Sequence, residues 1–309
     1  MTDDRPARTH VAREIQSQPR VWARALDQLG TVGAVLPQRG ERVAVIGCGT
    51  SWFMAESYAH LREQCGAGET DSFAASQFPA GRGYDRVVAI SRSGTTTEVL
   101  RAIDATQVPV LALTAVPDAP IGRAADQRIV LDFADERSVV QTVFATTALM
   151  LLRGSLGEPL EAVLGQAAAV LAGDHAVPSA IGAGSQFTFL GQGWAYGIAR
   201  EAGLKMREAA QLWTESYPQM EYRHGPISVA QPGRTVWVFG EPVTGLAADV
   251  AATGAAFVDD RLDPVADLIR AQLLAVRRAE EQGLDPDRPR HLARSVVLPE
   301  VISQVSSAP

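Results

Sequence analysis

The sequence predicts an α/β protein built from two tandem copies of one module, each with a parallel sheet between layers of helices. A short apolar segment at 43–47 runs into a glycine turn, and helical periodicity follows over 52–62. The pattern recurs from residue 187, where FTFLGQGWAYGIA aligns with the earlier VAVIGCGTSWFMA. In this alignment, residues 47–49 correspond to residues 191–193. Strands that alternate with helices favour a mostly parallel sheet covered on both faces.

The next strand of each half supports the duplication. VVAISRSGTTTEVL from Val87 has a counterpart in VWVFGEPVTGLAADV from Val236, at nearly the same distance from its own glycine turn. Between them we expect buried strands at 110–116 and 128–133 and a helix over 139–152.

Domain boundaries follow from composition. The stretch 154–178 contains Pro and Gly around an Ala/Leu-rich helix, and we place the junction there. Near the start, a helix from Arg13 to Gln16 is expected to lead into Gln18-Pro19 and a second helix, and a strand-like tail is expected after Pro289. The predicted parts are an N-terminal helical arm at 1–30, a first domain at 31–165 and a second domain at 166–309.

Composition limits the class of protein. With 309 residues, 46% of them hydrophobic, the chain can bury substantial cores. A net charge of -7 argues against a nucleic-acid or anionic-membrane partner. Cys48 and Cys65 form no disulfide framework, and no zinc-type spacing accompanies the histidines, so neither a metal nor an organic cofactor is expected. The chain has no apolar run of membrane-spanning length and no leader-like start, which favours a cytoplasmic location.

Two hydroxyl-rich loops stand out in the first half, GCGTS at 47–51 and SRSGTTT at 91–97. Each follows an apolar strand and precedes a helix, where backbone N–H groups attract anions and hydroxyls add donors. A single Ser or Thr in such a place is more often only a helix cap. Several hydroxyls in two equivalent loops favour a phosphate site, whereas the matching loops at 191–195 and 240–244 lack most of them.

A dinucleotide site is the alternative for the first glycine turn, because Asp71 lies at about the right distance downstream. Trp52 occupies the third glycine position of that motif. Such a large side chain would obstruct the pyrophosphate, so this alternative is disfavoured.

In the second half, Glu201, Lys205 and Glu208 have the spacing i, i+4, i+7, which places them on one helix face. Most such triplets are solvated ion pairs. Here the helix follows the glycine turn at 191–193, and His224-Gly225-Pro226 comes shortly afterwards. That context favours a functional role.

Together these motifs resemble the sugar isomerase (SIS) family, and within it the isomerase domain of glutamine–fructose-6-phosphate aminotransferase and its stand-alone relatives. The resemblance rests on AREIQSQPRVWARAL, GCGTS, SRSGTTTE, ERSVVQTVFATT, REAGLKMREAAQLWTESY, EYRHGP and DPDRPRHLARSVVLPE, which occur in the family's order over nearly the whole chain. It implies two tandem SIS domains of flavodoxin-like, three-layer α/β/α architecture.

The resemblance also implies roles for individual residues. Those that match sugar-phosphate-binding positions are Cys48, Gly49, Thr50, Ser51, Ser91, Arg92, Ser93, Thr96, Val139 and Gln141. Glu208 matches the proton-shuttling carboxylate, and Glu201 and Lys205 match a supporting ion pair. His224 matches a ring-opening histidine that enters from the neighbouring subunit of a homodimer. Arg294 stands where the aminotransferase has a C-terminal lysine, and a guanidinium cannot form an imine with a keto sugar.

The expected activity is that of an amino sugar 6-phosphate deaminase/isomerase, which gives a ketose 6-phosphate and ammonia. Moving a carbonyl between C1 and C2 needs one base that shuttles a proton between them, and an imidazole is suited to ring opening. With no glutaminase domain in the sequence, the synthetic aminotransferase reaction is not expected. The alternatives are a fructosamine 6-phosphate deglycase, a simple phosphosugar isomerase, or a regulatory protein that only senses a sugar phosphate.

Overall fold

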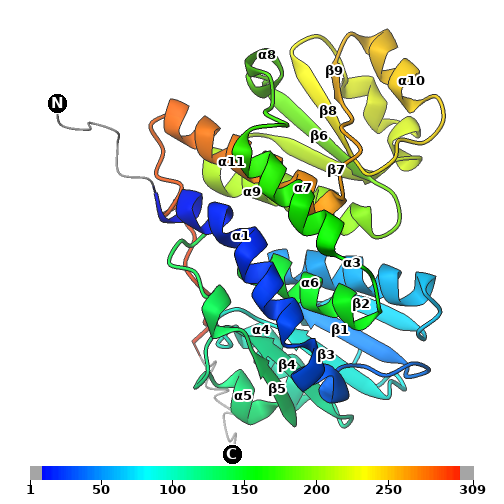
Figure 1. Cartoon of the computed structure of the whole chain (residues 1–309), viewed down its shortest axis with the longest axis vertical. Coiled ribbons are helices and arrows are strands. Elements are labelled where there is room, and N and C mark those ends of the chain that lie inside the picture. Colours follow the sequence, from blue (N-terminus) through cyan, green and yellow to red (C-terminus); the bar gives the residue numbers. More distant parts are fainter. Residues whose placement is uncertain (1–8, 300–309) are drawn as a thin grey trace, which may run out of the picture.

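The computed structural model describes residues 9–299 and contains two parallel sheets stacked along the long axis of the molecule (Figure 1). The first sheet has the order β2-β1-β3-β4-β5 and the second the order β7-β6-β8-β9. The strands are β1 (Val43–Gly47), β2 (Thr70–Ala74), β3 (Arg86–Ile90), β4 (Val110–Thr114), β5 (Gln127–Val130), β6 (Gln186–Gly191), β7 (Thr214–Pro218), β8 (Arg234–Phe239) and β9 (Ala256–Val258). The first four strands of each half therefore follow one connectivity.

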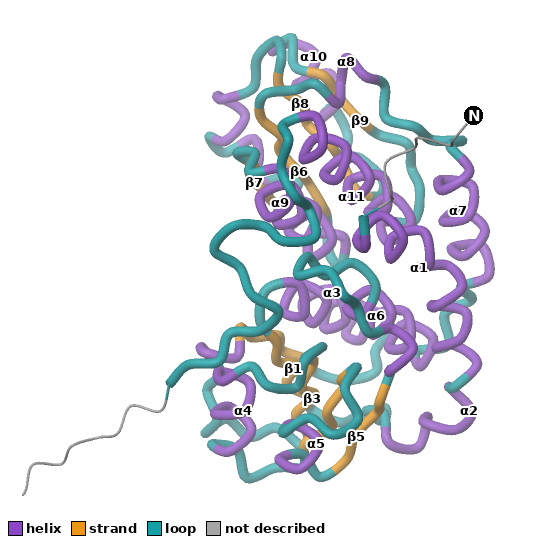
Figure 2. The backbone as a smooth tube through the Cα atoms, turned by 90° about the vertical axis from the view of Figure 1, so that its left-hand side faces the viewer, coloured by secondary structure: helices purple, strands orange, loops and turns teal. Residues whose placement is uncertain are grey.

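Helices cover the faces of both sheets. The α-helices are α1 (His10–Asp27), α2 (Leu29–Val32), α3 (Thr50–Gln64), α4 (Thr97–Asp104), α5 (Ile121–Ala124), α6 (Phe144–Ser155), α7 (Glu161–Ala172), α8 (Ser179–Gly182), α9 (Ala195–Ala210), α10 (Leu246–Thr253) and α11 (Pro264–Glu281). Helices α3 and α6 lie on the inner face of the first sheet, and α9 and α11 on the inner face of the second (Figure 2). Each sheet is thus one layer of an α/β stack, and the helices between the sheets meet one another.

The buried apolar residues reflect this layering. One large cluster joins the inner faces of the two sheets and includes Val45 from β1 and Phe187 from β6. Two smaller clusters lie on the outer faces, one around Ile103 of α4 and one around Val250 of α10. Because both halves contribute to the large cluster, burial of apolar area holds them together.

The strand register brings the loop-bearing ends of neighbouring strands to one edge. Gly47 of β1 pairs with Ala74 of β2, and Ile46 pairs with Ala89 of β3. Since the strands are parallel, the loops after β1 and β3 leave the same edge of the first sheet. The second sheet repeats this, with Gly191 opposite Phe239.

Several sequence predictions are corrected by the structure. The helix predicted over 139–152 begins only at Phe144, because the Glu136 carboxylate accepts hydrogen bonds from the N–H groups of Thr142 (2.5 Å), Val143 (2.7 Å) and Phe144 (3.0 Å) and holds the preceding residues irregular. The strand predicted at 128–133 ends at Val130, and a 3₁₀ turn follows.

The ends of the chain also differ from expectation. The arm is one helix, α1, that continues through Pro19, rather than two helices. Residues 290–299 contain no strand, and the rest of the predicted tail, like residues 1–8 of the arm, lies outside the described residues. The division at 165–166 falls within α7 and stays a prediction. Over residues 9–299, no helix is long and apolar enough to cross a membrane.

Candidate active site

The first hydroxyl loop is a tight turn between β1 and α3. A side chain on Gly47 would place its Cβ 2.7 Å from the backbone of Ser51, and Gly49 has a φ of 54°, so both positions favour glycine. Thr50 and Ser51 are buried at the start of α3, and no side chain caps this helix. The hydroxyls here are therefore not used as N-caps, which was the alternative to ligand binding.

The second hydroxyl loop follows β3. The Ser91 hydroxyl accepts a hydrogen bond from the Gly94 N–H at 3.2 Å, and the Ser93 hydroxyl accepts one from the Thr95 N–H at 3.3 Å. Thr96 stands at the N-cap of α4 without forming a side-chain cap bond. The loop is thus folded on itself at the same sheet edge as 47–51.

Helix α9 from the second half reaches the first loop. The Lys205 ammonium donates a hydrogen bond to the Thr50 hydroxyl at 3.1 Å, lies 3.4 Å from the Glu201 carboxylate and pairs closely with Glu208. Glu201 and Lys205 are fully buried, whereas the side chain of Glu208 is 20% exposed. Glu208 is therefore the member of the group that can meet a ligand.

Burial and neighbouring charges shift the pKa values of these side chains. Burial raises the pKa of Glu201 to about 8, and the neighbouring Glu208 adds to the rise while Lys205 opposes it. Burial would lower the pKa of Lys205, but the two carboxylates outweigh it and raise that pKa, so Lys205 remains a cation at neutral pH. In the glycine turn, burial and the charge of Glu98 raise the pKa of Cys48 to about 11, which keeps its thiol protonated.

Arg92 is occupied within the protein. Its guanidinium donates to the carbonyls of Ser138 and Arg294, both at 3.0 Å, and lies 3.9 Å from the Glu136 carboxylate. The side chain is almost completely buried. In this structure Arg92 ties the second hydroxyl loop to its neighbours rather than presenting a free charge.

The C-terminal segment crosses the second hydroxyl loop. Ser295 and Thr95 share a hydrogen bond between hydroxyls at 2.9 Å, and the Thr97 N–H donates to the Val296 carbonyl at 3.1 Å. The Arg294 guanidinium bonds to the Glu136 carbonyl and to the Asp135 carboxylate. The charge of Arg294 is thus engaged beside the loop.

Val139 and Gln141 lie between Glu136 and α6. The Val139 N–H donates to the Asp287 carbonyl at 3.1 Å. Among the described residues, the Gln141 side-chain oxygen is buried and has no hydrogen-bond partner. A buried amide oxygen without a partner is costly, so a ligand that donates to it would be stabilised.

His224 lies apart from this group within one chain. It is exposed, in the segment after β7, and its neighbour Arg223 forms an ion pair with Asp249 of α10 at 2.7 Å. The structure thus brings Thr50, Lys205 and Glu208 together, whereas His224 lies exposed elsewhere on the second half.

Sequence analysis did not single out Glu136 or Ser295. Glu136 is buried, and its carboxylate accepts hydrogen bonds from N–H groups at the start of α6. It lies farther from the helix in sequence than the usual capping residues do, so the sequence showed it only as part of the ERSVVQTVFATT motif. Nothing in the sequence pairs Ser295 with Thr95. No group of three or more His, Cys, Asp or Glu residues within 9–299 could hold a metal ion.

Comparisons with known proteins bear on the family of the first half and on the fold of the chain. Residues 38–155, which include both hydroxyl loops, match the family model of the SIS domain. The chain therefore carries a SIS domain in its first half.

Among curated relatives, the glutamine–fructose-6-phosphate aminotransferase (isomerizing) of Methanothermobacter thermautotrophicus is 28% identical over 93% of this chain and 57% of its own length. The enzyme of the same name from Gloeobacter violaceus is 27% identical over 96% of this chain and 60% of its own. The chain thus spans somewhat over half the length of these relatives.

Two solved structures share the fold over both halves. A glucosamine-6-phosphate deaminase from Thermotoga maritima superimposes with a TM-score of 0.76 and 22% identity, covering 94% of this chain and all of that one. A tagatose-6-phosphate ketose/aldose isomerase from Escherichia coli gives a TM-score of 0.74 and 19% identity, covering 96% of this chain and all of that one. At these identities the likeness concerns the fold.

Proposed function

We propose that this protein is a phosphosugar enzyme of the aldose–ketose isomerase type, acting on an amino sugar 6-phosphate such as glucosamine or galactosamine 6-phosphate. The observation that carries the proposal is the contact between Lys205 and Thr50, because it sets the Glu208 carboxylate beside the hydroxyl loops of the first half. The phosphate would bind to the hydroxyls of Ser51, Ser91, Ser93 and Thr96 and to backbone N–H groups.

The known proteins support this assignment. The curated relatives are named as isomerizing aminotransferases that act on fructose 6-phosphate, and the structural neighbours as a glucosamine-6-phosphate deaminase and a tagatose-6-phosphate isomerase. All of these names concern a sugar 6-phosphate. We propose the same class of substrate here.

In the proposed reaction, Glu208 removes the proton from C2 of the open-chain aldehyde while the substrate's own ammonium group passes a proton to O1, which gives an enol-amine. Return of that proton to C1 leaves a hydroxymethyl group at C1 and an iminium at C2. Water adds to C2, and ammonia leaves, so the products are a ketose 6-phosphate and ammonia. Lys205 forms an ion pair with Glu208 and so can orient its carboxylate for proton transfer.

The remaining features belong to the same proposal. We infer a second SIS domain because the second half repeats the strand order of the first. We also propose that Arg92 and Arg294 hold the loop at 91–97 in its conformation. His224 is exposed in one chain, which suits a ring-opening group supplied by a second copy in a homodimer. Mixing His224→Ala with Glu208→Gln would restore activity if His224 acts across an interface, and would not if it acts within its own chain.

The test is product analysis with glucosamine 6-phosphate and with galactosamine 6-phosphate. We expect equal amounts of ammonia and a ketose 6-phosphate from one of them. Formation of the ketose from an aldose 6-phosphate alone would point to a simple isomerase, and amine release only from a fructosamine 6-phosphate would point to a deglycase. Tight binding of these sugars without any product would refute the catalytic assignment and favour a sensor.

A further inference from the structure

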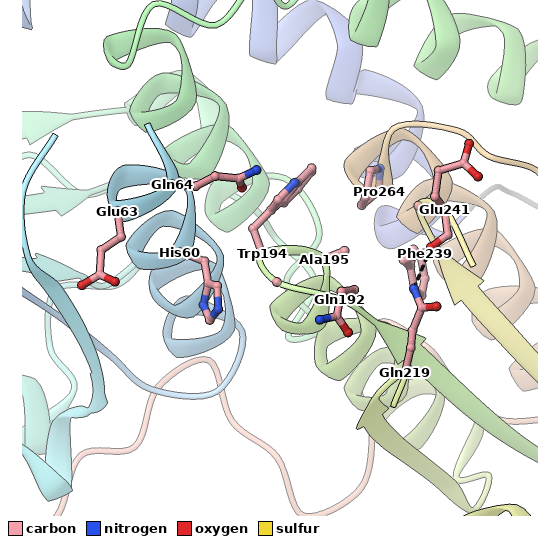
Figure 3. A pocket seen from close by; sticks show the side chains of 12 residues that line it. His60, Glu63, Gln64, Gln192, Trp194, Ala195, Gln219, Phe239, Glu241 and Pro264 are labelled. Carbon is pink, nitrogen blue, oxygen red and sulfur yellow. Dashed lines mark hydrogen bonds between the residues drawn. The ribbon is translucent and has the colours of Figure 1, made fainter. Parts of the chain in front are cut away.

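The second half has a pocket of its own, with a volume of about 720 Å³, at the edge where β6 and β8 end (Figure 3). Side chains from α3 of the first half form its opposite wall. The lining residues are His60, Glu63, Gln64, Gln192, Gly193, Trp194, Ala195, Gln219, Phe239, Gly240, Glu241 and Pro264.

This pocket occupies the place in the second half that the hydroxyl loops occupy in the first. In the sequence, 144 residues separate Gly47 from Gly191, and the same interval separates Gln64 from Glu208. A Cβ on Gly49 would lie 3.9 Å from Leu204 of α9, and one on Gly193 would lie 3.9 Å from His60 of α3. Each glycine turn therefore faces the inner helix of the other half.

The chemistry of the second pocket is unsuited to phosphate. Trp194 and Ala195 occupy the positions of Thr50 and Ser51, so the hydroxyl donors are missing. None of its lining residues is Lys or Arg, and two of them, Glu63 and Glu241, are acidic. A dianion would meet negative charge and few donors there.

Besides the acidic Glu63 and Glu241, the polar side chains that line the pocket are amides and an imidazole. His60 and Gln192 approach it from opposite walls, with Gln64 and Trp194 above them in the view of Figure 3. Amides and a neutral imidazole each donate and accept hydrogen bonds, as sugar hydroxyls do. The indole of Trp194 offers an apolar surface, and Arg153 lies 4.6 Å from its ring and helps to hold it in place.

The rim of the pocket is held in place by Gln219, which is fully buried. Its amide nitrogen donates to the Glu241 carbonyl at 2.9 Å, and its amide oxygen accepts from the Val243 N–H at 2.7 Å. Its backbone N–H donates to the Gly191 carbonyl at 3.1 Å. One side chain thus joins the two loops that border the pocket, so the site is formed before any ligand binds.

We propose that this pocket is a second ligand site that binds a neutral, unphosphorylated hexose or N-acetylhexosamine. Hydroxyls of the sugar pair with His60, Gln64 and Gln192, and the apolar face of the ring lies on Trp194. This site does not depend on the reaction proposed for the first half. The proposed ligand lacks the negatively charged phosphate group that we propose the first half binds.

The experiment is a ligand-observed NMR titration of the whole chain with glucose, galactose and N-acetylglucosamine. We expect at least one of them to bind, and Gln192→Ala and His60→Ala to weaken that binding about tenfold, the loss of one or two hydrogen bonds. Both residues are exposed, so the variants should keep the wild-type melting temperature.

The matched control is Ser93→Ala in the first half, which should leave binding of the neutral sugar unchanged. Glucose 6-phosphate should show the reverse pattern, with weaker binding to Ser93→Ala and normal binding to Gln192→Ala. The proposal is overturned if none of the three sugars binds, or if Ser93→Ala rather than Gln192→Ala removes their binding.

Discussion

The two halves share one strand order and one type of glycine turn, but they present different chemistry at the same edge. The turn of the first half continues into Thr50 and Ser51 and faces Lys205 and Glu208 of α9. The turn of the second half continues into Trp194 and faces His60 and Gln64 of α3. The backbone supplies an edge that can accept a ligand, and the side chains decide which ligand it accepts.

The largest effect is expected from Glu208→Gln. Loss of the base that we propose for proton transfer should lower kcat by about 10²- to 10⁴-fold while sugar phosphate binding persists. Steady-state kinetics and a calorimetric titration separate the two quantities. Gln64→Glu, at the equivalent place on α3 of the first half, should leave kcat unchanged, and a comparable loss there would remove the distinction between the two pockets.

The buried ion pair of the first half should matter both for folding and for the ligand. Glu136→Gln leaves the Arg92 guanidinium buried without its carboxylate and should lower the free energy of unfolding by about 3–5 kcal/mol. Because Arg92 anchors the loop at 91–97, sugar phosphate binding should weaken as well. Urea unfolding and a ligand titration measure the two effects.

Asp267→Asn is the matched change in the second half, because Asp267 is a buried carboxylate paired with Arg270 at 2.7 Å. It should destabilise the protein without changing sugar phosphate affinity under conditions where the protein is folded. Equal losses of affinity in both variants would show that Glu136 acts on stability alone.

The pH dependence of stability should also differ between the halves. Glu201 has a pKa raised from 4.5 to about 8, so the native state keeps a proton that the unfolded chain releases, and stability falls as pH rises between these values. Its counterpart on α3 is Ser57, which does not titrate there and donates to the Trp194 carbonyl at 2.9 Å.

Glu201→Gln should therefore flatten this decline in the free energy of unfolding, by up to about 5 kcal/mol across the window. Urea unfolding at several pH values measures it. The exposed Glu241→Gln serves as the control and should keep the wild-type slope. An unchanged slope in Glu201→Gln would mean that Glu201 is ionised in the folded protein.

The smallest effect is expected from single hydroxyls. Ser93→Ala removes one charge-assisted hydrogen bond to the phosphate and should weaken sugar phosphate binding about tenfold. Ala195→Ser adds a hydroxyl at the second-half position equivalent to Ser51 and should bring no gain. Calorimetry gives both affinities. No loss with Ser93→Ala would place the phosphate elsewhere.

Sequence patterns predicted the part of the fold that depends on local periodicity. The apolar segment 43–47 is β1 as predicted, and the alignment of 47–49 with 191–193 matches the shared strand order. The predicted start of α6 was wrong because the Glu136 carboxylate, which lies away from the usual capping position, determines where the helix begins. Side-chain burial and partners of this kind depend on tertiary packing, which periodicity does not contain.

The same distinction applies to the site. The helical spacing of Glu201, Lys205 and Glu208 predicted one face, and the structure adds that this face contacts Thr50 across the two halves. The engagement of Arg92 by backbone carbonyls could not be predicted, because Arg294 is 202 residues away along the chain. Sequence analysis missed the pocket around Trp194 because its lining residues come from both halves and no single one of them is chemically conspicuous.

The most direct test of the account is a crystal structure of Glu208→Gln with glucosamine 6-phosphate. We predict that the phosphate lies within hydrogen-bonding distance of the Ser91, Ser93 and Thr96 hydroxyls, with C1 and C2 of the sugar beside residue 208. A phosphate bound instead in the pocket lined by Trp194 and Gln192 would contradict the assignment of the two halves.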